Sequence, residues 1–311
     1  MACQTRLLIF LHLTFFLTMA PATASKTIRR IDPQPHQGRS AAVVVRGQSI
    51  LHTGQLFPTR SNSAVPTGDL PTQYQNLMAN LEQILSQSQS HKSDILKLNF
   101  CVAKTDIANY LRNALSDWFT VQRLPAVSYV QSRPPLPGAL LALDAVIAVQ
   151  PISGSRPRRA PSPDPERAIG GAIYSVMPRG DVLYISGQAQ PGDLLPATTA
   201  TLQGLRKTMQ HLELGLESIV QLKCYLEPIS RAVEVEERIT QFFGALPRPP
   251  VSHVEWTAGS LPIEIELIVH AEAANSAESI ESITPPGLPS SPVFSRVVRL
   301  YGDHRIYLSG M

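Results

Sequence analysis

Two acidic side chains on one short strand are the residues whose type and spacing most clearly suggest a site. Glu264 and Glu266 alternate with isoleucines in the run Ile-Glu-Ile-Glu over 263–266. Because residues i and i+2 share a face of a strand, both carboxylates point away from Ile263 and Ile265. The same alternation also describes the polar face of an ordinary amphipathic strand. Both interpretations stay open on the sequence alone.

Other chemistry is sparse. The sequence contains no Gly-x-Ser-x-Gly, His-Glu-x-x-His, Cys-x-x-Cys or P-loop motif. His253 lies alone in an apolar strand, where a histidine is more often structural than functional. Cys101 and Cys224 lie in strand-like apolar runs, which favours small buried hydrophobes over a disulfide. We expect no cofactor and no metal site.

An internal repeat defines the elements that position these residues. The segment 43–55 recurs at 176–188, and matches at a second spacing run from Leu81 and Leu205 to Val130 and Val254. Matching residues of the two copies lie nine residues further apart in the 43–55 segment than in the segments that follow it. The first copy therefore carries a nine-residue insertion. Prolines and serines place the insertion in the loop 57–72.

Both copies have the same predicted order of elements, ββαβαββ, which makes one sheet with two helices on one face. A hairpin with Arg-Gly at its turn opens each copy, at 46–47 and 179–180. Leu77, Leu81 and Ile84 have the spacing of an amphipathic helix. The other predicted strands are 95–102, 126–131 and 140–149 in the first copy and 219–226, 251–256 and 263–270 in the second.

The chain divides into repeats joined by proline-rich and serine-rich segments, which we interpret as solvated linkers. The predicted parts are a signal peptide over 1–25, a first domain over 41–149, a linker over 150–171, a second domain over 172–271, a linker over 272–292, and the start of a third repeat over 293–311. A hairpin alone cannot bury its apolar face. We call the segment 293–311 the third opening. It either docks on another copy or begins a third domain of a longer chain, and we favour the second alternative.

The first 25 residues have the features of a secretory signal. Arg6 provides a positive start, 7–17 is largely apolar but short for a membrane span, and Ala24-Ser25 is a suitable cleavage site. We expect an exported protein, periplasmic or secreted. The net charge of +3 is too small to indicate nucleic-acid binding.

The ordered set of segments resembles the Rid family, also called YjgF-like. The resemblance rests on the Ser-Gly-Gln over 186–188 that ends the opening strands of the second copy, on Leu-Pro-Ala-Val-Ser-Tyr-Val over 124–130 and on Ile-Glu-Ile-Glu. It covers 41–149 and 172–271. It implies an α+β, chorismate-mutase-like fold and trimers whose sheets face inward. It also implies small-molecule clefts between neighbouring units. In this chain the trimer could form between chains or as a pseudo-trimer within one.

The resemblance further implies hydrolysis of 2-imino and enamine acids, for which this chain is incomplete. The family's carboxylate-binding arginine is replaced by Val127 and Val251, which offer no donor. The water-placing glutamate is kept as Glu264 and lost as Ala142. Arg248 could substitute for the missing arginine, although a solvated loop arginine is the commoner case. The remaining candidates for lining a cleft are Thr53, Gly54, Ser186, Gly187 and His253.

These losses favour an exported Rid-like protein that is not a deaminase and that binds a small ligand or partner in its inter-domain clefts. One alternative is an imine deaminase of the 2-iminobutanoate/2-iminopropanoate type, a hydrolase that uses Glu264 and Arg248 of domain two. Another is a structural assembly module. Ribonuclease activity is least favoured, because no basic, aromatic surface is visible. Neither nucleic acid nor, after cleavage, a membrane is an expected partner, whereas self-association is.

Overall fold

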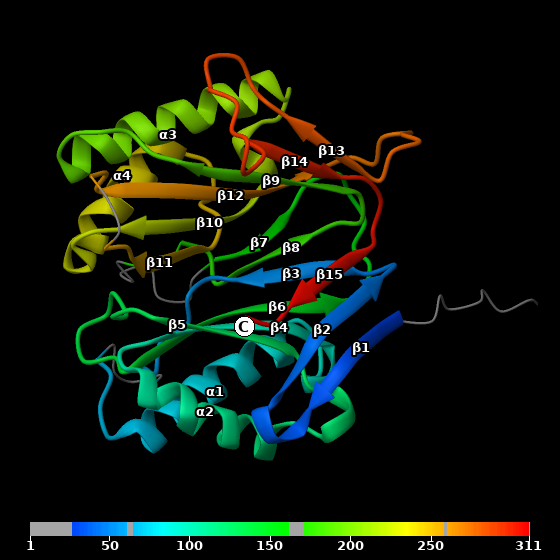
Figure 1. Cartoon of the computed structure of the whole chain (residues 1–311), viewed down its shortest axis with the longest axis vertical. Helices are drawn as coiled ribbons and strands as arrows, with labels where there is room; N and C mark the ends of the chain where they lie inside the picture. Colours follow the sequence, from blue (N-terminus) through cyan, green and yellow to red (C-terminus); the bar gives the residue numbers. More distant parts are fainter. Residues whose placement is uncertain (1–26, 61–64, 162–168, 170, 258–259, 311) are drawn as a thin grey trace, which may run out of the picture.

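The computed structural model describes residues 27–60, 65–161, 169, 171–257 and 260–310 (Figure 1). The signal peptide expected over 1–25 lies outside these residues. Two sheets face each other across the middle of the molecule, and a pair of helices covers the outer face of each sheet (Figure 1). No helix among the described residues has the length and apolar character needed to cross a membrane.

Both repeats have the predicted order ββαβαββ. The first consists of β2 (Arg39–Arg46), β3 (Ser49–Thr53), α1 (Leu70–Gln87), β4 (Ile95–Val102), α2 (Thr105–Trp118), β5 (Ala126–Gln131) and β6 (Leu141–Val149). The second consists of β8 (Tyr174–Met177), β9 (Asp181–Gln188), α3 (Leu194–His211), β10 (Ile219–Leu226), α4 (Ala232–Phe243), β11 (Val251–Glu255) and β12 (Ile263–Ala271). The inserted loop falls between β3 and α1. The third opening contains the strands β14 (Val297–Leu300) and β15 (Arg305–Leu308).

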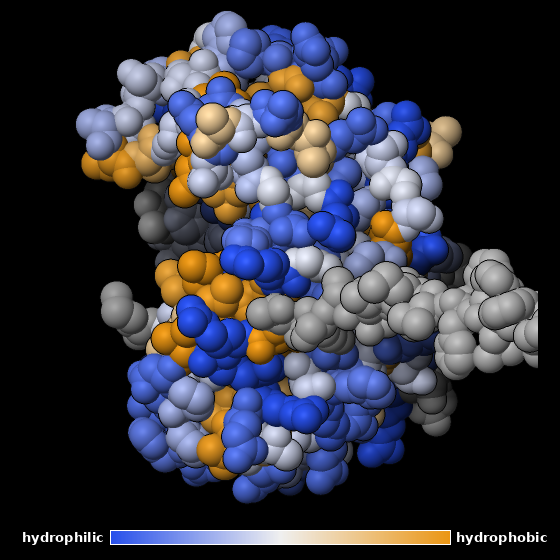
Figure 2. All heavy atoms as spheres, turned by 90° about the vertical axis from the view of Figure 1, so that its right-hand side faces the viewer, coloured by the Kyte–Doolittle hydropathy of each residue, from blue (hydrophilic) through white to orange (hydrophobic). Residues whose placement is uncertain are grey.

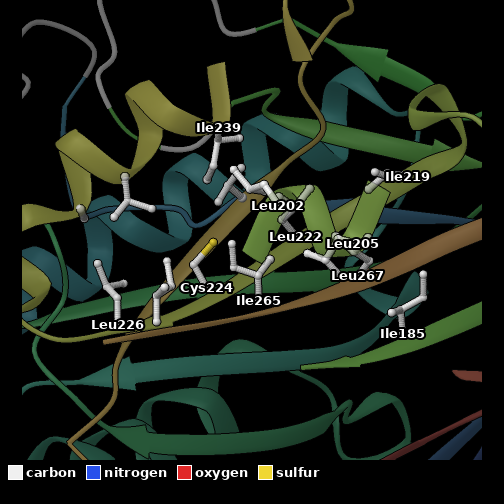
Figure 3. Packing of buried hydrophobic residues seen from close by; sticks show 14 of the residues in the cluster. Ile185, Leu202, Leu205, Ile219, Leu222, Cys224, Leu226, Ile239, Ile265 and Leu267 are labelled. Atoms are coloured by element: carbon white, nitrogen blue, oxygen red, sulfur yellow. The ribbon is translucent and has the colours of Figure 1, made fainter. Parts of the chain in front are cut away.

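Amphipathic helices cover the outer face of each sheet and bury its apolar side chains. Helix α1 starts where the Asp69 carboxylate accepts a hydrogen bond from the backbone N–H of Thr72. Its predicted apolar positions, among them Leu77 and Leu81, are buried against the sheet. In the second repeat, side chains of α3, α4, β10 and β12 interdigitate in one core, which includes Cys224 (Figure 3). Both predicted buried cysteines are indeed buried and free.

The strands that flank each Arg-Gly turn do not pair with each other, so the predicted hairpins are wrong. β2 pairs with β1 (Thr27–Gln34), whereas β3 pairs with β6 and β8. In the second repeat, β8 pairs with β3 and β7 (Arg158–Ala160), whereas β9 pairs with β12 and β14. Alternation of apolar and polar residues identifies a strand but does not identify the strand with which it pairs. The strand before each Arg-Gly turn and the strand after it therefore pair with different partners.

Three equivalent strand pairings link the repeats in a cycle. β3 of the first repeat pairs with β8 of the second, with Ile50 opposite Met177. β9 of the second repeat pairs with β14 of the third opening. β15 of the third opening returns to β2 of the first repeat, with Ile306 opposite Val44. The third opening thus docks on both other copies, which is one of the two outcomes left open by the sequence.

The segments interpreted as solvated linkers contain short strands, β7 in the first and β13 (Ile280–Ile283) in the second. Arg159 of β7 is tied to the second repeat, because its guanidinium donates to backbone carbonyls there. Its acceptors are Leu216, Glu217, Ile219 and Pro247. Burial lowers the pKa of Arg159 to about 10. Arg159 attaches this segment to the second repeat, which corrects the interpretation of this part of the chain as a solvated linker.

One face of β15 stays exposed. Ile306 and Leu308 are each 64% exposed, whereas their counterparts Leu183 and Ile185 in β9 are 1% exposed beneath the helices. Figure 2 shows the side of the molecule on which β1 and β2 lie, where apolar side chains gather between two largely polar lobes. No described residue of this chain covers the outer face of β15 as α3 covers that of β9.

Candidate functional site

The structure brings the end of an opening strand in one repeat against the segment of the next repeat that carries the lost arginine position. We call two such places the first and second junctions. At the first junction, 53–55 after β3 meets 251–253 of β11. At the second, 309–310 after β15 meets 127–128 of β5. The candidate cleft-lining residues of the first repeat are thus next to the second repeat.

Hydrogen bonds close the first junction. The Gln55 side-chain amide donates to the His253 carbonyl at 3.0 Å and its oxygen accepts from the His253 N–H at 3.1 Å. The backbone N–H of Gln55 donates to the carbonyl of Val251 at 3.2 Å. Gln221 donates to the carbonyl of Thr53 at 2.9 Å. Val251 is fully buried, so its position is enclosed by apolar packing and by bonds between the repeats.

A buried charge cluster lies directly behind this junction. The Nε2 atom of His253 is 2.9 Å from Oε1 of Glu236, and Nη1 of Arg248 donates to Oε2 of the same carboxylate at 2.8 Å. The side chains of His253 and Glu236 are 0% and 2% exposed. The Arg248 guanidinium is therefore engaged by Glu236 and is not directed to a substrate carboxylate.

Glu236 is a site residue that the sequence analysis missed. It lies on the buried face of α4 with Ala232, Val235, Ile239 and Phe243. A charged residue within an apolar helical stripe is a signal that a partner is buried nearby. In the first repeat the positions of Glu236 and His253 are held by Arg112 and Tyr129. There the guanidinium lies 5.7 Å from the ring centroid.

Hydrogen bonds also close the second junction. The Ser309 hydroxyl donates to the Ser40 carbonyl at 2.6 Å and accepts from the N–H of Val127 at 2.8 Å. The N–H of Gly310 donates to the carbonyl of Val127 at 3.0 Å. Val127, like Val251, is fully buried. Both positions of the lost arginine are thus enclosed in contacts between repeats.

Lys97 fastens the end of β15 at the second junction. Its ammonium donates to the Ser128 hydroxyl at 2.6 Å and to the carbonyl of Leu308. Burial and the neighbouring charge of Lys223 lower the pKa of Lys97 to about 8, against a partial opposing effect of Asp144. Gln221 is the equivalent residue at the first junction, where it holds the end of β3 without a charge.

Replacing Lys97 by glutamine is expected to remove a pH dependence of stability. The folded pKa of Lys97 is about 8, below the value of about 10.4 in an unfolded chain. The unfolded state therefore binds more protons between these values, and this group makes the free energy of unfolding rise with pH across that window. We expect the wild type to gain on the order of 1–2 kcal/mol relative to Lys97→Gln between pH ~8 and ~10. Denaturant unfolding at several pH values measures this difference, and parallel pH profiles would contradict it.

The end of β9 is arranged differently, with its acidic neighbours partly exposed. Gly187 lies so close to Glu264 that a β-carbon there would be 1.9 Å from the carboxylate oxygen Oε1. Burial and the Glu266 carboxylate raise the pKa of Glu264. The Tyr225 hydroxyl donates to Glu266 at 3.3 Å. We call Glu264, Glu266, Tyr225 and Gly187 the acidic site.

The acidic site adjoins the third opening. Ser186 donates through its hydroxyl to the carbonyl of Ser295 at 2.7 Å and through its N–H to that of Arg296 at 3.0 Å. The predicted site residues Ser186, Gly187 and Glu264 thus lie together, apart from Thr53, Gly54 and His253 at the first junction.

In chemical terms, the acidic site can accept hydrogen bonds and stabilise a positive charge. Carboxylates repel carboxylates, so these groups cannot hold the acid end of a 2-imino acid. In the first repeat Ala142 is fully buried, and Asp144 accepts from Asn99 at 2.7 Å and lies 3.6 Å from the Lys223 ammonium. Within the described ranges, no group of three or more His, Cys, Asp or Glu side chains is arranged to hold a metal ion.

Comparison with known proteins finds a family model that matches the first repeat. The family model described as Endoribonuclease L-PSP matches residues 31–149. No curated protein matches the chain significantly. Solved structures similar to it include the Rid-family protein YyfB of Yersinia pestis, with 23% identity over 39% of this chain and 98% of that one and a TM-score of 0.33. A YjgF/YER057c/UK114 family member of Mycobacterium tuberculosis has 27% identity over 37% and 99%, with a TM-score of 0.28. E. coli TdcF with bound serine has 19% identity over 37% and 94%, with a TM-score of 0.28.

The match falls on the domain whose element order and opening segments carry the resemblance. It includes β2 to β6 and both helices of the first repeat. The second repeat has the same order of elements around its own sheet. Residues 31–149 thus match the Endoribonuclease L-PSP family model, which confirms the resemblance of this part of the chain to the Rid or YjgF-like family.

Proposed function

We propose that this protein is a non-deaminating, exported Rid-like protein that binds a small ligand at the acidic site, while its first and second junctions hold the repeats together. The observation that carries the proposal is the burial of both Val127 and Val251. A substrate carboxylate brought to either position would meet a buried valine in place of the guanidinium, while the nearest cations, Lys97 and Arg248, are already hydrogen bonded within the protein. It would therefore lose its hydration without compensation. Such a cost is incompatible with productive binding of a 2-imino acid.

The deaminase alternative needs Arg248 as a substitute for the lost arginine. Arg248 would have to leave the Glu236 carboxylate, which is 2% exposed. Removing one partner of a buried pair leaves an uncompensated charge and costs several kcal/mol. The ion pair therefore argues against this alternative.

The assembly alternative has a specific observation in its favour, the cyclic pairing of opening strands. Thr53, which the resemblance predicts to line a cleft, and its neighbour Gln55 are bonded to the next repeat here. Holding repeats together and binding a ligand at the acidic site are compatible roles, since different residues perform them.

The ligand that suits the acidic site carries an amine or several hydrogen-bond donors. Glu264 and Glu266 offer acceptors on one strand face, and Tyr225 is hydrogen bonded to Glu266. Glu264→Gln keeps the shape and removes one charge. We expect this variant to lose a ligand that native mass spectrometry detects on the wild-type protein, and retention by both forms would refute a role for Glu264.

Imine hydrolysis is the direct test of the non-deaminase proposal. An amino-acid oxidase would generate 2-iminopropanoate while semicarbazide traps it. We expect the rate of semicarbazone formation to be unchanged by the mature protein, even at high concentration, whereas an active deaminase added as a positive control slows it. Slower trapping in proportion to protein concentration would contradict the proposal, and Arg248→Ala would then show whether Arg248 is responsible.

Export is part of this proposal and rests on the sequence of the first 25 residues. Expressed from its full sequence in a secreting host, the protein is expected outside the cytoplasm with Ser25 as its first residue. Intact mass measurement of the recovered protein tests this. A mass that retains Met1 to Ala24 would contradict it.

A further inference from the structure

A groove between α3 and α4, on the outer face of the second repeat, is distinct from the junctions and from the acidic site. It has a volume of about 410 Å³. Arg206 and Lys207 of α3 and Arg238 of α4 line it, together with the ring of Phe242 and the amide of Gln203. Three cations thus face one hollow with an aromatic wall.

The arginines of this groove are hydrogen bonded to neutral groups, and the interacting carboxylate, Glu234, pairs with Arg231 and acts on Arg238 only over a longer distance. Arg206 donates to the carbonyl of Phe242 at 2.9 Å and its guanidinium lies 4.6 Å from the ring centroid. Arg238 donates to the side-chain oxygen of Gln241 at 3.1 Å. Among the described residues, no carboxylate forms an ion pair within 4 Å with Arg206, Lys207 or Arg238. An anion entering the groove would therefore not have to displace a carboxylate already present.

The first repeat is built differently at the same place. Glu82 holds the position of Arg206, Ala114 that of Arg238 and Trp118 that of Phe242. There the Lys92 ammonium lies 4.0 Å from the Trp118 ring centroid and 2.8 Å from the Glu82 carboxylate. Both repeats place a cation on the aromatic ring, but only the first repeat neutralises it. The charge of the groove is therefore a property of the second repeat and not a requirement of the fold.

We propose that the α3–α4 groove binds a small organic anion, with a phosphate or carboxylate group between the three cations and an apolar body against Phe242. Arginine recognises both groups through paired N–H donors. Leu202, which is 2% exposed at the base of the groove, provides further apolar surface for such a body.

Isothermal titration calorimetry of the full protein with phenyl phosphate tests this site. We expect saturable binding at one site, weaker binding of inorganic phosphate, and no heat from benzyl alcohol. Arg206→Glu and Arg238→Ala, the residues found in the first repeat, are expected to lower the affinity roughly tenfold or more. Arg29→Glu, which makes the same charge change as Arg206→Glu on exposed strand β1, serves as the control and should leave the affinity unchanged.

Several results would overturn the proposal. These are no binding of phenyl phosphate, equal affinity for inorganic phosphate, or equal losses in Arg206→Glu and Arg29→Glu. A fourth is binding to phosphatidylglycerol vesicles that depends on Arg206 while phenyl phosphate does not bind, because a membrane surface would then be the partner. A fifth is self-association that Arg206→Glu abolishes, because a second copy would then occupy the groove. Unchanged thermal unfolding of the variants keeps loss of binding distinct from loss of fold.

Discussion

Replacing Glu236 by alanine is expected to lower the free energy of unfolding by about 3 kcal/mol. Glu236 is 2% exposed and accepts from Arg248 at 2.8 Å while lying 2.9 Å from the Nε2 atom of His253. Without the carboxylate, a fully buried imidazole and a guanidinium that is 25% exposed lose their partner. A lost partner for a buried charge costs far more than the net worth of the pair, because the remaining charge is left without water.

The matched control is Glu234→Ala, on the same helix. Glu234 pairs with Arg231 at 2.7 Å, but both side chains are about 40% exposed to solvent. Exposed ion pairs contribute about 0–1 kcal/mol, so this variant should unfold close to the wild type. Urea unfolding of both variants gives the comparison. Equal, small losses would mean that the Glu236 cluster does not support the second repeat.

Replacing Gln55 by alanine is expected to cost about 2–4 kcal/mol, because two buried backbone groups of another repeat lose their partners. The Gln55 amide donates to the carbonyl of His253 and accepts from its N–H, and all these groups are buried. Gln55→Glu keeps an acceptor but loses the donor, so we expect an intermediate effect or one as large as that of alanine.

Gln188→Ala is the control for Gln55, since Gln188 ends the opening strand of the second repeat. Its amide donates to the Thr208 hydroxyl at 2.7 Å, within its own domain. Loss of this one bond should cost about 1 kcal/mol. Chemical unfolding of both variants checks the order. An effect of Gln188→Ala equal to that of Gln55→Ala would contradict a special role for Gln55 between repeats.

Much of the fold follows from local patterns in the sequence. The positions of Leu77, Leu81 and Ile84 predicted helix α1, and all three are buried on its inner face. The partners of the opening strands could not be predicted in this way. The residues around Arg46 and Gly47 alternate as a hairpin would, yet β2 pairs with strands of other segments. Alternation of apolar and polar residues identifies a strand but not its partner, and β2 pairs with the preceding strand β1 and with the distant strand β15 instead of β3.

The same limit applies to the candidate site. The resemblance identified Val127 and Val251 as lost arginine positions, and the structure adds that both are enclosed. The distance between Arg248 and Glu236 was not predictable, because twelve residues of helix and loop separate them. Glu236 itself could have been identified from the sequence, because it is an acidic residue on the apolar face of α4. The role of Arg159 could not be predicted from the sequence, because its acceptors are backbone carbonyls of another segment, which any residue type provides.

Native-state hydrogen exchange at the two junctions tests most directly the claim that these segments are joints and not open clefts. The amide of Gln55 bonds to Val251, and those of Ser309 and Gly310 bond to Ala41 and Val127. The account predicts that these three amides are protected to a level near that of the central strands β4 and β10. Exchange as fast as in exposed loops would contradict it, because the junctions would then be open to water and to a substrate.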